Sequence, residues 1–204
     1  MKKWGFLAAI MLLCQSLAAQ FELTPQGFVD SRNGQNRYVV YEFSGRTQQE
    51  LFDICRINIE TARQTATELF YSSESPDSIT ITQYVPNVIW NARQLGQDYL
   101  MDINFSVTFR FREGRIRADS PVILAMIYRR PVEKNGMRVD ERDYYWLTQQ
   151  DYKNANLGGK YIYDRNGVIK SAGTKVKESL EDFMNRYISD MIRHAPEQAK
   201  PEDW

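Results

Sequence analysis

The chain has 204 residues, with 26 basic and 26 acidic side chains, 43% apolar residues and 13% aromatic residues. This composition excludes a disordered segment, a collagen-like repeat and a multi-span membrane protein, and the length predicts one folded domain. Because the formal charge is zero, no basic surplus supports counterion release, and we expect no nucleic-acid partner.

The first nineteen residues predict a cleaved export signal. Two lysines precede an apolar run over residues 4–14, which has the length of a signal-peptide core and is too short to span a bilayer. Cleavage after Ala18 or after Ala19 suits signal peptidase. An uncleaved anchor is the alternative, whereas the large leucine before Cys14 argues against lipoprotein processing. We expect an exported protein, periplasmic or extracellular, with no stable membrane insertion after cleavage.

Export leaves few residues for histidine or thiol chemistry. Cys55 is then the one remaining cysteine, so no intramolecular disulfide forms, and its place on an apolar helix stripe indicates a buried thiol rather than a reactive one. The sole histidine, His194, lies near the end of the last predicted helix, where a cation suits the helix dipole. The mature chain has a formal charge of about −2, since cleavage removes two lysines.

The first half of the chain predicts a strand and a long helix. Residues 20–36 form a polar, turn-rich lead-in, and residues 37–44 predict a strand from their β-branched and aromatic content. Residues 47–50 form a capping box, and the apolar spacing that follows predicts a helix from about Gln48 to Tyr71. Two strands follow, at residues 78–85 and, more weakly, 88–94.

The clearest signal is a strand over residues 99–111, where every odd position is apolar and nearly every even position is polar. Such alternation predicts a strand with one buried and one solvated face. Glu113 and Gly114 predict a two-residue hairpin loop, with the return strand running toward Arg129, broken at Pro121 and ended by Pro131. The register that keeps apolar residues together pairs Phe111 with Ile116 and Phe109 with Ala118.

The remaining sequence completes an α+β domain over residues 20–194. Residues 131–170 are polar and rich in tyrosine, and we interpret them as an insertion with a small hairpin near residues 160–170. Apolar residues at helical spacing then predict a last helix over residues 176–192, followed by a frayed tail at 195–204. One antiparallel sheet with both long helices on its apolar face satisfies the whole pattern.

Several phrases of this sequence resemble one protein family. They are LTPQGFV in the lead-in, YVVYEFSG running into TQQELF, SITITQYV, and DINFSVTFRFREGRIRA in the hairpin. Together with the last helix, they make the chain similar to exported Gram-negative bacterial domains of unknown function with a TATA-binding-protein-like fold. The resemblance covers roughly Phe21 to Ala125 and Lys175 to His194, and residues 131–170 depart from it by their length. It implies a β-α-β4-α fold and no function, so it provides no catalytic residues.

The predicted hairpin places arginines opposite each other on its solvated face: Arg112 opposite Arg115, and Arg110 opposite Arg117. Like charges that face each other destabilise a sheet unless something neutralises them. Asp119 and Glu113 are near enough in sequence to do so. The arginines form either a solvated face that resists edge pairing or a site for an anionic ligand or an acidic partner.

Aromatic residues crowd the insertion, notably Tyr144, Tyr145, Trp146, Tyr152, Tyr161 and Tyr163. They either attach the insertion to the sheet or contact a carbohydrate or a protein, because Tyr and Trp combine a large area with a polar tip. We select Tyr144, Tyr145 and Trp146, with the four arginines, as candidate binding residues.

The sequence shows no residue pattern typical of a catalytic site or a metal site. The segment 151–156 has the polarity of a calcium loop, but Lys153 stands where an oxygen ligand is required and the closing glutamate is missing. We therefore expect no catalytic residues, no metal and no cofactor. The sequence favours a non-catalytic envelope or secreted binding module, with an envelope protein or a small anionic or carbohydrate ligand as partner. The alternatives are a hydrolase that uses carboxylates and a structural subunit of an envelope assembly.

Overall fold

The computed structural model describes residues 21–66, 68–94, 97–149 and 160–193. The predicted export signal, the segment 151–156, His194 and the C-terminal tail lie outside these residues. The helices are α2 (Gln48–Arg63) and α3 (Ser171–Ile192). The strands are β1 (Phe21–Thr24), β2 (Gly27–Asp30), β3 (Tyr38–Glu42), β4 (Glu68–Glu74), β5 (Ser78–Gln94), β6 (Gln97–Arg112), β7 (Arg115–Asp119), β8 (Val122–Lys134), β9 (Met137–Thr148) and β10 (Lys160–Tyr163).

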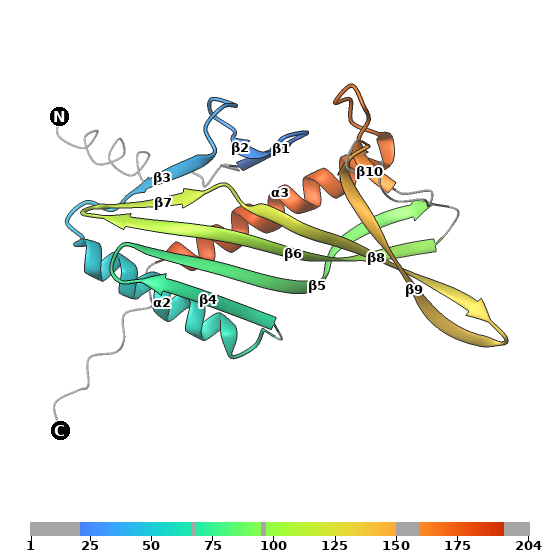
Figure 1. Ribbon diagram of the computed structural model, residues 1–204, viewed down its shortest axis with the longest axis horizontal. Helices are drawn as coiled ribbons and strands as arrows, with labels where there is room; N and C mark the ends of the chain where they lie inside the picture. Colours follow the sequence, from blue (N-terminus) through green and yellow to red (C-terminus); the bar gives the residue numbers. More distant parts are fainter. Residues whose placement is uncertain (1–20, 67, 95–96, 150–159, 194–204) are drawn as a thin grey trace, which may run out of the picture.

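One large sheet organises the described residues. Its strand order is β10-β9-β8-β6-β5-β4. At the C-terminal end of β6, the same sheet also contains β7, which pairs with β6 and with β3. Both α2 and α3 lie on one face of this sheet, and the β8–β9 hairpin extends beyond it (Figure 1). The remaining two strands, β1 and β2, form a separate hairpin.

The central strand β6 has the predicted orientation. Phe105, Phe109 and Phe111 are buried, whereas Arg110 is exposed on the opposite face. Phe111 packs edge-on against Phe52 of α2, and Phe105 packs against Phe183 of α3. The predicted hairpin register is confirmed at each of its four pairs: Phe111↔Ile116, Phe109↔Ala118, Arg112↔Arg115 and Arg110↔Arg117. The expected α+β class, with two helices on the apolar face of the sheet, is confirmed.

The first helix begins where its capping box predicts and ends earlier than its periodicity suggests. The Glu50 amide donates to the Thr47 hydroxyl, and the Glu50 carboxylate accepts from the Thr47 amide. The helix stops at Arg63, and the residues from Glu68 form β4 instead. Pairing with β5 overrides the helical spacing there, because it buries Leu69 in the sheet.

The structure has more strands than the sequence predicts, and one pair of strands is parallel where an antiparallel sheet was expected. The lead-in contains the β1–β2 hairpin, and the two strands expected at 78–94 form one long strand with register shifts. Much of the expected insertion is the β8–β9 hairpin, which continues through Pro131 and turns at Asn135 and Gly136. β10 pairs in parallel with β9, so the sheet is mixed rather than wholly antiparallel.

The edge of β1 that does not pair with β2 is hydrogen bonded by side chains, mainly those of α3. The Phe21 amide donates to the Asn185 amide oxygen at 2.9 Å, and the Leu23 amide donates to the Glu181 carboxylate at 2.7 Å. The Tyr163 hydroxyl donates to the Leu23 carbonyl. Side chains of α3, together with Tyr163 of β10, therefore satisfy the backbone groups of β1 that a neighbouring strand would otherwise pair.

Close packing of α3 on β10 depends on Gly173. A Cβ at this position would lie 2.6 Å from the carbonyl oxygen of Ile162, which is backbone and has little freedom to move. Gly173→Ala is therefore expected to destabilise the protein by about 1–3 kcal/mol through overpacking, despite the better helix propensity of alanine. Denaturant unfolding measures this loss, with the exposed Ser171→Ala as the control. Equal stability of the two variants would contradict the close packing.

Two further features bear on localisation and reactivity. Among the described residues, no helix combines the length and apolar character needed to cross a membrane. Cys55 is fully buried on α2, and this burial raises the pKa of its thiol. The interpretation of Cys55 as a structural residue agrees with this position.

Candidate functional site

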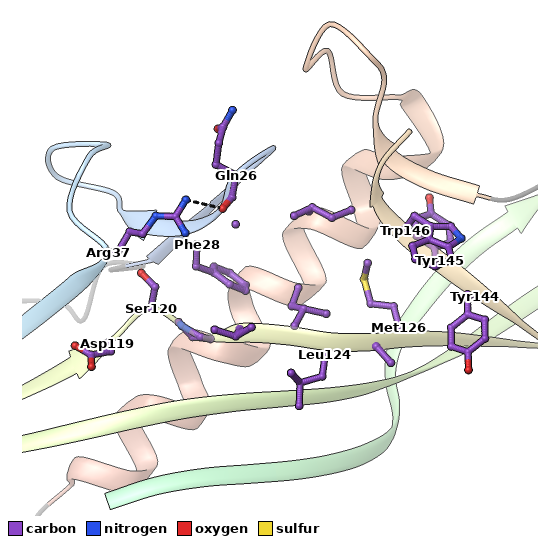
Figure 2. A pocket seen from close by; sticks show the side chains of 16 residues that line it. Gln26, Phe28, Arg37, Asp119, Ser120, Leu124, Met126, Tyr144, Tyr145 and Trp146 are labelled. Carbon is purple, nitrogen blue, oxygen red and sulfur yellow. Dashed lines mark hydrogen bonds between the residues drawn. The ribbon is translucent and has the colours of Figure 1, made fainter. Parts of the chain in front are cut away.

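A cleft of about 570 Å³ opens beside β8, between the β1–β2 hairpin and β9 (Figure 2). A volume of this size is typical of a small-molecule or peptide site. The cleft is lined by Gln26, Gly27, Phe28, Arg37, Asp119, Ser120, Pro121, Val122, Ile123, Leu124, Ala125, Met126, Tyr144, Tyr145, Trp146 and Leu147. Polar side chains gather at the end near Asp119, and the aromatic side chains of β9 gather at the other end (Figure 2).

The cleft exists because the neighbours of β8 separate from it. Along this edge, β3 pairs with β7 as far as Tyr38↔Asp119, and the Ser120 amide donates to the Arg37 carbonyl at 2.9 Å. On the other side, β9 pairs with β8 only from Tyr145↔Met126 onward. Among the described strands, Val122, Ile123 and Ala125 therefore pair with β6 alone, and Leu124 lies at a register shift between the two strands.

Apolar side chains on this segment are unusually accessible. Val122 is 57% exposed, Leu124 is 52% exposed, and Tyr144 across the cleft is 54% exposed. Phe28 and Met126, which also line the cleft, belong to the buried core. The cleft thus connects the hydrophobic core with a group of exposed apolar side chains, a combination typical of binding sites.

The polar end of the cleft has an excess of cationic groups. Arg110 and Arg117 both bind the Asp119 carboxylate, at 2.9 and 2.7 Å. Arg37 donates to the Gln26 carbonyl at 2.9 Å, and no carboxylate among the described residues pairs with it. The Ser120 hydroxyl oxygen is buried and lacks a hydrogen-bond partner within the described part of the chain. Two guanidinium groups thus bind the single carboxylate of the lining, and the guanidinium of Arg37 lines the same end without a carboxylate among the described residues, which favours an anionic group there.

The four predicted arginines therefore have two different environments. Arg110 and Arg117 share Asp119, one of the two acidic residues expected to neutralise them, and Arg117 also lies over the Tyr38 ring at 4.1 Å. Arg115 pairs with Glu42 at 3.4 Å. Arg112 has no ion pair within the described ranges. The hairpin thus borders the cleft through Asp119, and its arginines do not form the lining itself.

All three predicted aromatic residues, Tyr144, Tyr145 and Trp146, line the cleft. Tyr144 and Trp146 lie close together on one side of β9, with their ring centroids 5.9 Å apart. Tyr145 is buried, and its hydroxyl donates to the Tyr161 carbonyl at 3.4 Å. Burial raises the pKa of Tyr145 to about 12, so its phenol stays protonated at neutral pH. Tyr145 therefore attaches β9 to β10, while its two neighbours are available to a ligand.

The other side of the cleft is not predicted from the sequence. Its residues come from the lead-in and from the start of β8, which lie far apart in the chain. One signal is visible in the sequence: residues 121–126 read PVILAM, an apolar run without the alternation of the preceding strand. Such a run indicates a strand that is apolar on both faces. It does not reveal that one edge of this strand is unpaired.

A second polar cluster lies on the outer face of the sheet, around Asp102. This carboxylate is 1% exposed and accepts hydrogen bonds from the Tyr84 hydroxyl at 2.6 Å, the Asn87 amide at 3.0 Å and Arg129 Nη2 at 2.8 Å. Burial acts to raise the pKa of Asp102, but these donors and the guanidinium charge lower it below its usual value overall. Asn87 has a positive φ of 57° at a register shift of β5, so the cluster holds this irregular segment in place. We assign it a structural role.

Among the described residues, no group of three or more His, Cys, Asp or Glu side chains is arranged to hold a metal ion. The cleft lining contains one carboxylate, Asp119. A hydrolase that uses a carboxylate pair would need a second one across the reacting bond.

Comparison with known proteins concerns the fold. No family model and no curated protein matches the sequence. A TBP-like protein from Parabacteroides distasonis is 11% identical over 76% of this chain and 87% of that chain, with a TM-score of 0.45. A DUF4468 family protein from Bacteroides ovatus is 10% identical over 80% of this chain and 88% of that chain, with a TM-score of 0.49. The expected resemblance is thus confirmed as structural similarity to a TBP-like protein and to a DUF4468 family protein, neither of whose names states a function.

Proposed function

We propose that this protein is a non-catalytic, exported binding module whose site is the cleft between β2, β8 and β9. The observation that carries the proposal is the open segment Val122–Ala125, where exposed apolar side chains border a 570 Å³ cleft. An apolar surface of this kind is costly to leave in water unless a ligand or a partner covers it.

The chemistry of the lining supports binding rather than catalysis. Asp119, the carboxylate of the lining, is held by two arginines, and the phenol of Tyr145 stays protonated at neutral pH because of its burial. The described lining also holds no second carboxylate that could form an acid–base pair with Asp119 across a reacting bond. The hydrolase alternative therefore receives no support from the cleft.

Ligand-dependent thermal stability tests this function. A ligand at about 100 times its Kd stabilises the folded state by about 2.7 kcal/mol, which raises the Tm of a protein of this size by about 5–11 °C. We expect such a shift with a member of a panel of small anions, carbohydrates, amphipathic anions and short peptides. Leu124→Arg should abolish it, because the guanidinium would occupy the mouth of the cleft.

The matched control is Phe70→Arg. Phe70 is an exposed apolar side chain at 69% exposure on β4, at the opposite edge of the sheet. This variant should keep the full Tm shift. A shift that survives Leu124→Arg, or the absence of a shift with every class of compound, would contradict binding in the cleft.

The exposed tip of the β8–β9 hairpin favours a second candidate, a structural subunit of an envelope assembly. Beyond Arg129, β8 pairs with β9 alone among the described strands, and the apolar side chains of Met137 and Val139 are 66% and 39% exposed. This candidate predicts that a photo-crosslinker at the tip captures an envelope protein, whereas the binding module does not require such a contact.

A further inference from the structure

We propose that the occupant of the cleft is an extended peptide that pairs with the open edge of β8 as an additional strand. This inference rests on the function proposed above and specifies its ligand. The peptide would carry apolar side chains at alternating positions and a carboxylate at its C-terminal end.

The backbone of β8 provides the main argument. Val122–Ala125 have β6 on one side and the cleft on the other. Elsewhere on this edge, β3 and β9 supply partners, and the edge of β1 is hydrogen bonded by α3 side chains. An extended peptide provides backbone donors and acceptors at the spacing that an unpaired strand edge requires.

The size of the cleft agrees with a short strand. In a packed sheet, strands lie about 4.8 Å apart, rise about 3.3 Å per residue and span about 10 Å between layers, so an extended residue occupies roughly 160 Å³. A cleft of about 570 Å³ therefore holds roughly three to four residues. The open segment Val122–Ala125 spans about 13 Å of strand, with a register shift against β6 at Leu124.

The direction of the peptide follows from the strands that flank the open segment. Both β3 and β9 run antiparallel to the chain of β7 and β8. A peptide that continues their row runs from the Ala125 end toward Ser120, so its C-terminal end arrives at the polar end of the cleft. There Arg37 lines the cleft without a carboxylate partner among the described residues, whereas Asp119 is already bound by Arg110 and Arg117, so the C-terminal carboxylate of the peptide would complement Arg37.

The side chains of the peptide would meet apolar surface. Val122 and Leu124 are both exposed, and Tyr144 and Trp146 face the same cleft from β9. Phe28 and Met126 extend this apolar surface toward the core. Alternating apolar residues on the peptide therefore find neighbours on the cleft walls, whereas an unbranched lipid tail would leave the β8 backbone unpaired.

The test uses the mature protein and a fluorescent pool of hexapeptides in which Val, Ile or Leu alternates with Thr or Ser. Each peptide ends in Asp with a free carboxylate. We expect binding by fluorescence anisotropy, weakened at least about 10-fold by Leu124→Arg and unchanged by Phe70→Arg. Two sets of peptides are N-methylated on the backbone, one at the odd positions and one at the even positions. The set whose methylated N–H groups would face β8 should bind at least about 10-fold more weakly, because those hydrogen bonds are lost. Amidation of the C-terminus should weaken binding further at low salt.

Other results would overturn the proposal in distinguishable ways. If both sets of N-methylated peptides bind as tightly as the unmethylated peptides, strand pairing is excluded. If the pool fails to bind but dodecanoate raises the Tm of the wild type and not of Leu124→Arg, the occupant is an amphipathic anion and the cleft remains the site. A dimer in sedimentation that Leu124→Arg dissociates would assign the edge to a second copy of the chain. If neither the peptides nor dodecanoate bind and the protein is a monomer, the peptide proposal is wrong, and the result also contradicts the cleft as a binding site.

Discussion

Replacing Asp102 by asparagine is expected to destabilise the protein by about 3–5 kcal/mol, which lowers the Tm by about 10 °C. The carboxylate is almost fully buried and accepts from Tyr84, Asn87 and Arg129. Asparagine keeps the volume but removes the charge, so the half-buried Arg129 loses its counterion. Removal of one partner of a buried pair costs more than the pair itself contributes, because a charge remains in a site of low polarity.

The matched control for this change is Asp182→Asn. Asp182 pairs with Arg186 on α3, and both side chains are largely exposed. The loss there should stay below about 0.5 kcal/mol, because solvent screens exposed pairs. Urea unfolding of both variants measures the difference, and similar losses in the two variants would contradict the structural role of the Asp102 cluster.

The pH dependence provides a second measurement on the same variant. The pKa of Asp102 is lowered in the folded state, so its contribution to stability is present above the pKa of the unfolded chain, about 4, and is lost as the pH falls. The gap in unfolding free energy between wild type and Asp102→Asn should therefore be constant above about pH 5 and narrow below pH 4. A gap that widens on acidification would show the opposite sign and contradict the lowered pKa.

The second large effect is expected from Phe105→Ala, at about 3–5 kcal/mol. Phe105 is fully buried in the middle of β6, and its ring contacts Phe183 at 5.8 Å and Tyr187 at 5.0 Å between centroids, both edge-on. Truncation leaves a cavity under α3 and removes two aromatic contacts, and both terms act in the same direction.

Phe70→Ala is the control for this prediction. It makes the same chemical change at a side chain that is 69% exposed on the edge strand β4. Its cost should be within about 0.5 kcal/mol. Calorimetry distinguishes the two variants, and comparable losses would mean that the alternating pattern of β6 does not mark the core.

Local sequence patterns were sufficient to predict the central part of the fold, which is β6, β7 and the start of α2. Alternation along β6 determines which face is buried, because a shift by one residue would move every apolar side chain to the solvent. The Glu113-Gly114 turn then determines the register of β7, and the capping box marks the start of α2. Each of these signals depends on residues that are near one another in the chain, and each prediction was confirmed.

Predictions that depended on distant partners were less complete. The helical spacing continues to residue 71, yet α2 ends at Arg63 and residues from Glu68 onward form β4, because β5 offers a strand to pair with. The segment expected to be an insertion forms much of the β8–β9 hairpin and so extends the sheet. Asp102 stands at a position of the solvated face but is covered by Tyr84 and Arg129 from two other strands.

The candidate site shows the same division. By itself, the sequence determined the chemistry of Tyr144, Tyr145 and Trp146 and the charge of the arginine hairpin, because these follow from residue type and from a two-strand register. Only the tertiary structure decided that these groups border one cleft with Phe28 and Leu124. Whether a strand edge is open depends on where β3 and β9 stop pairing, and that is set by packing between segments far apart in the chain.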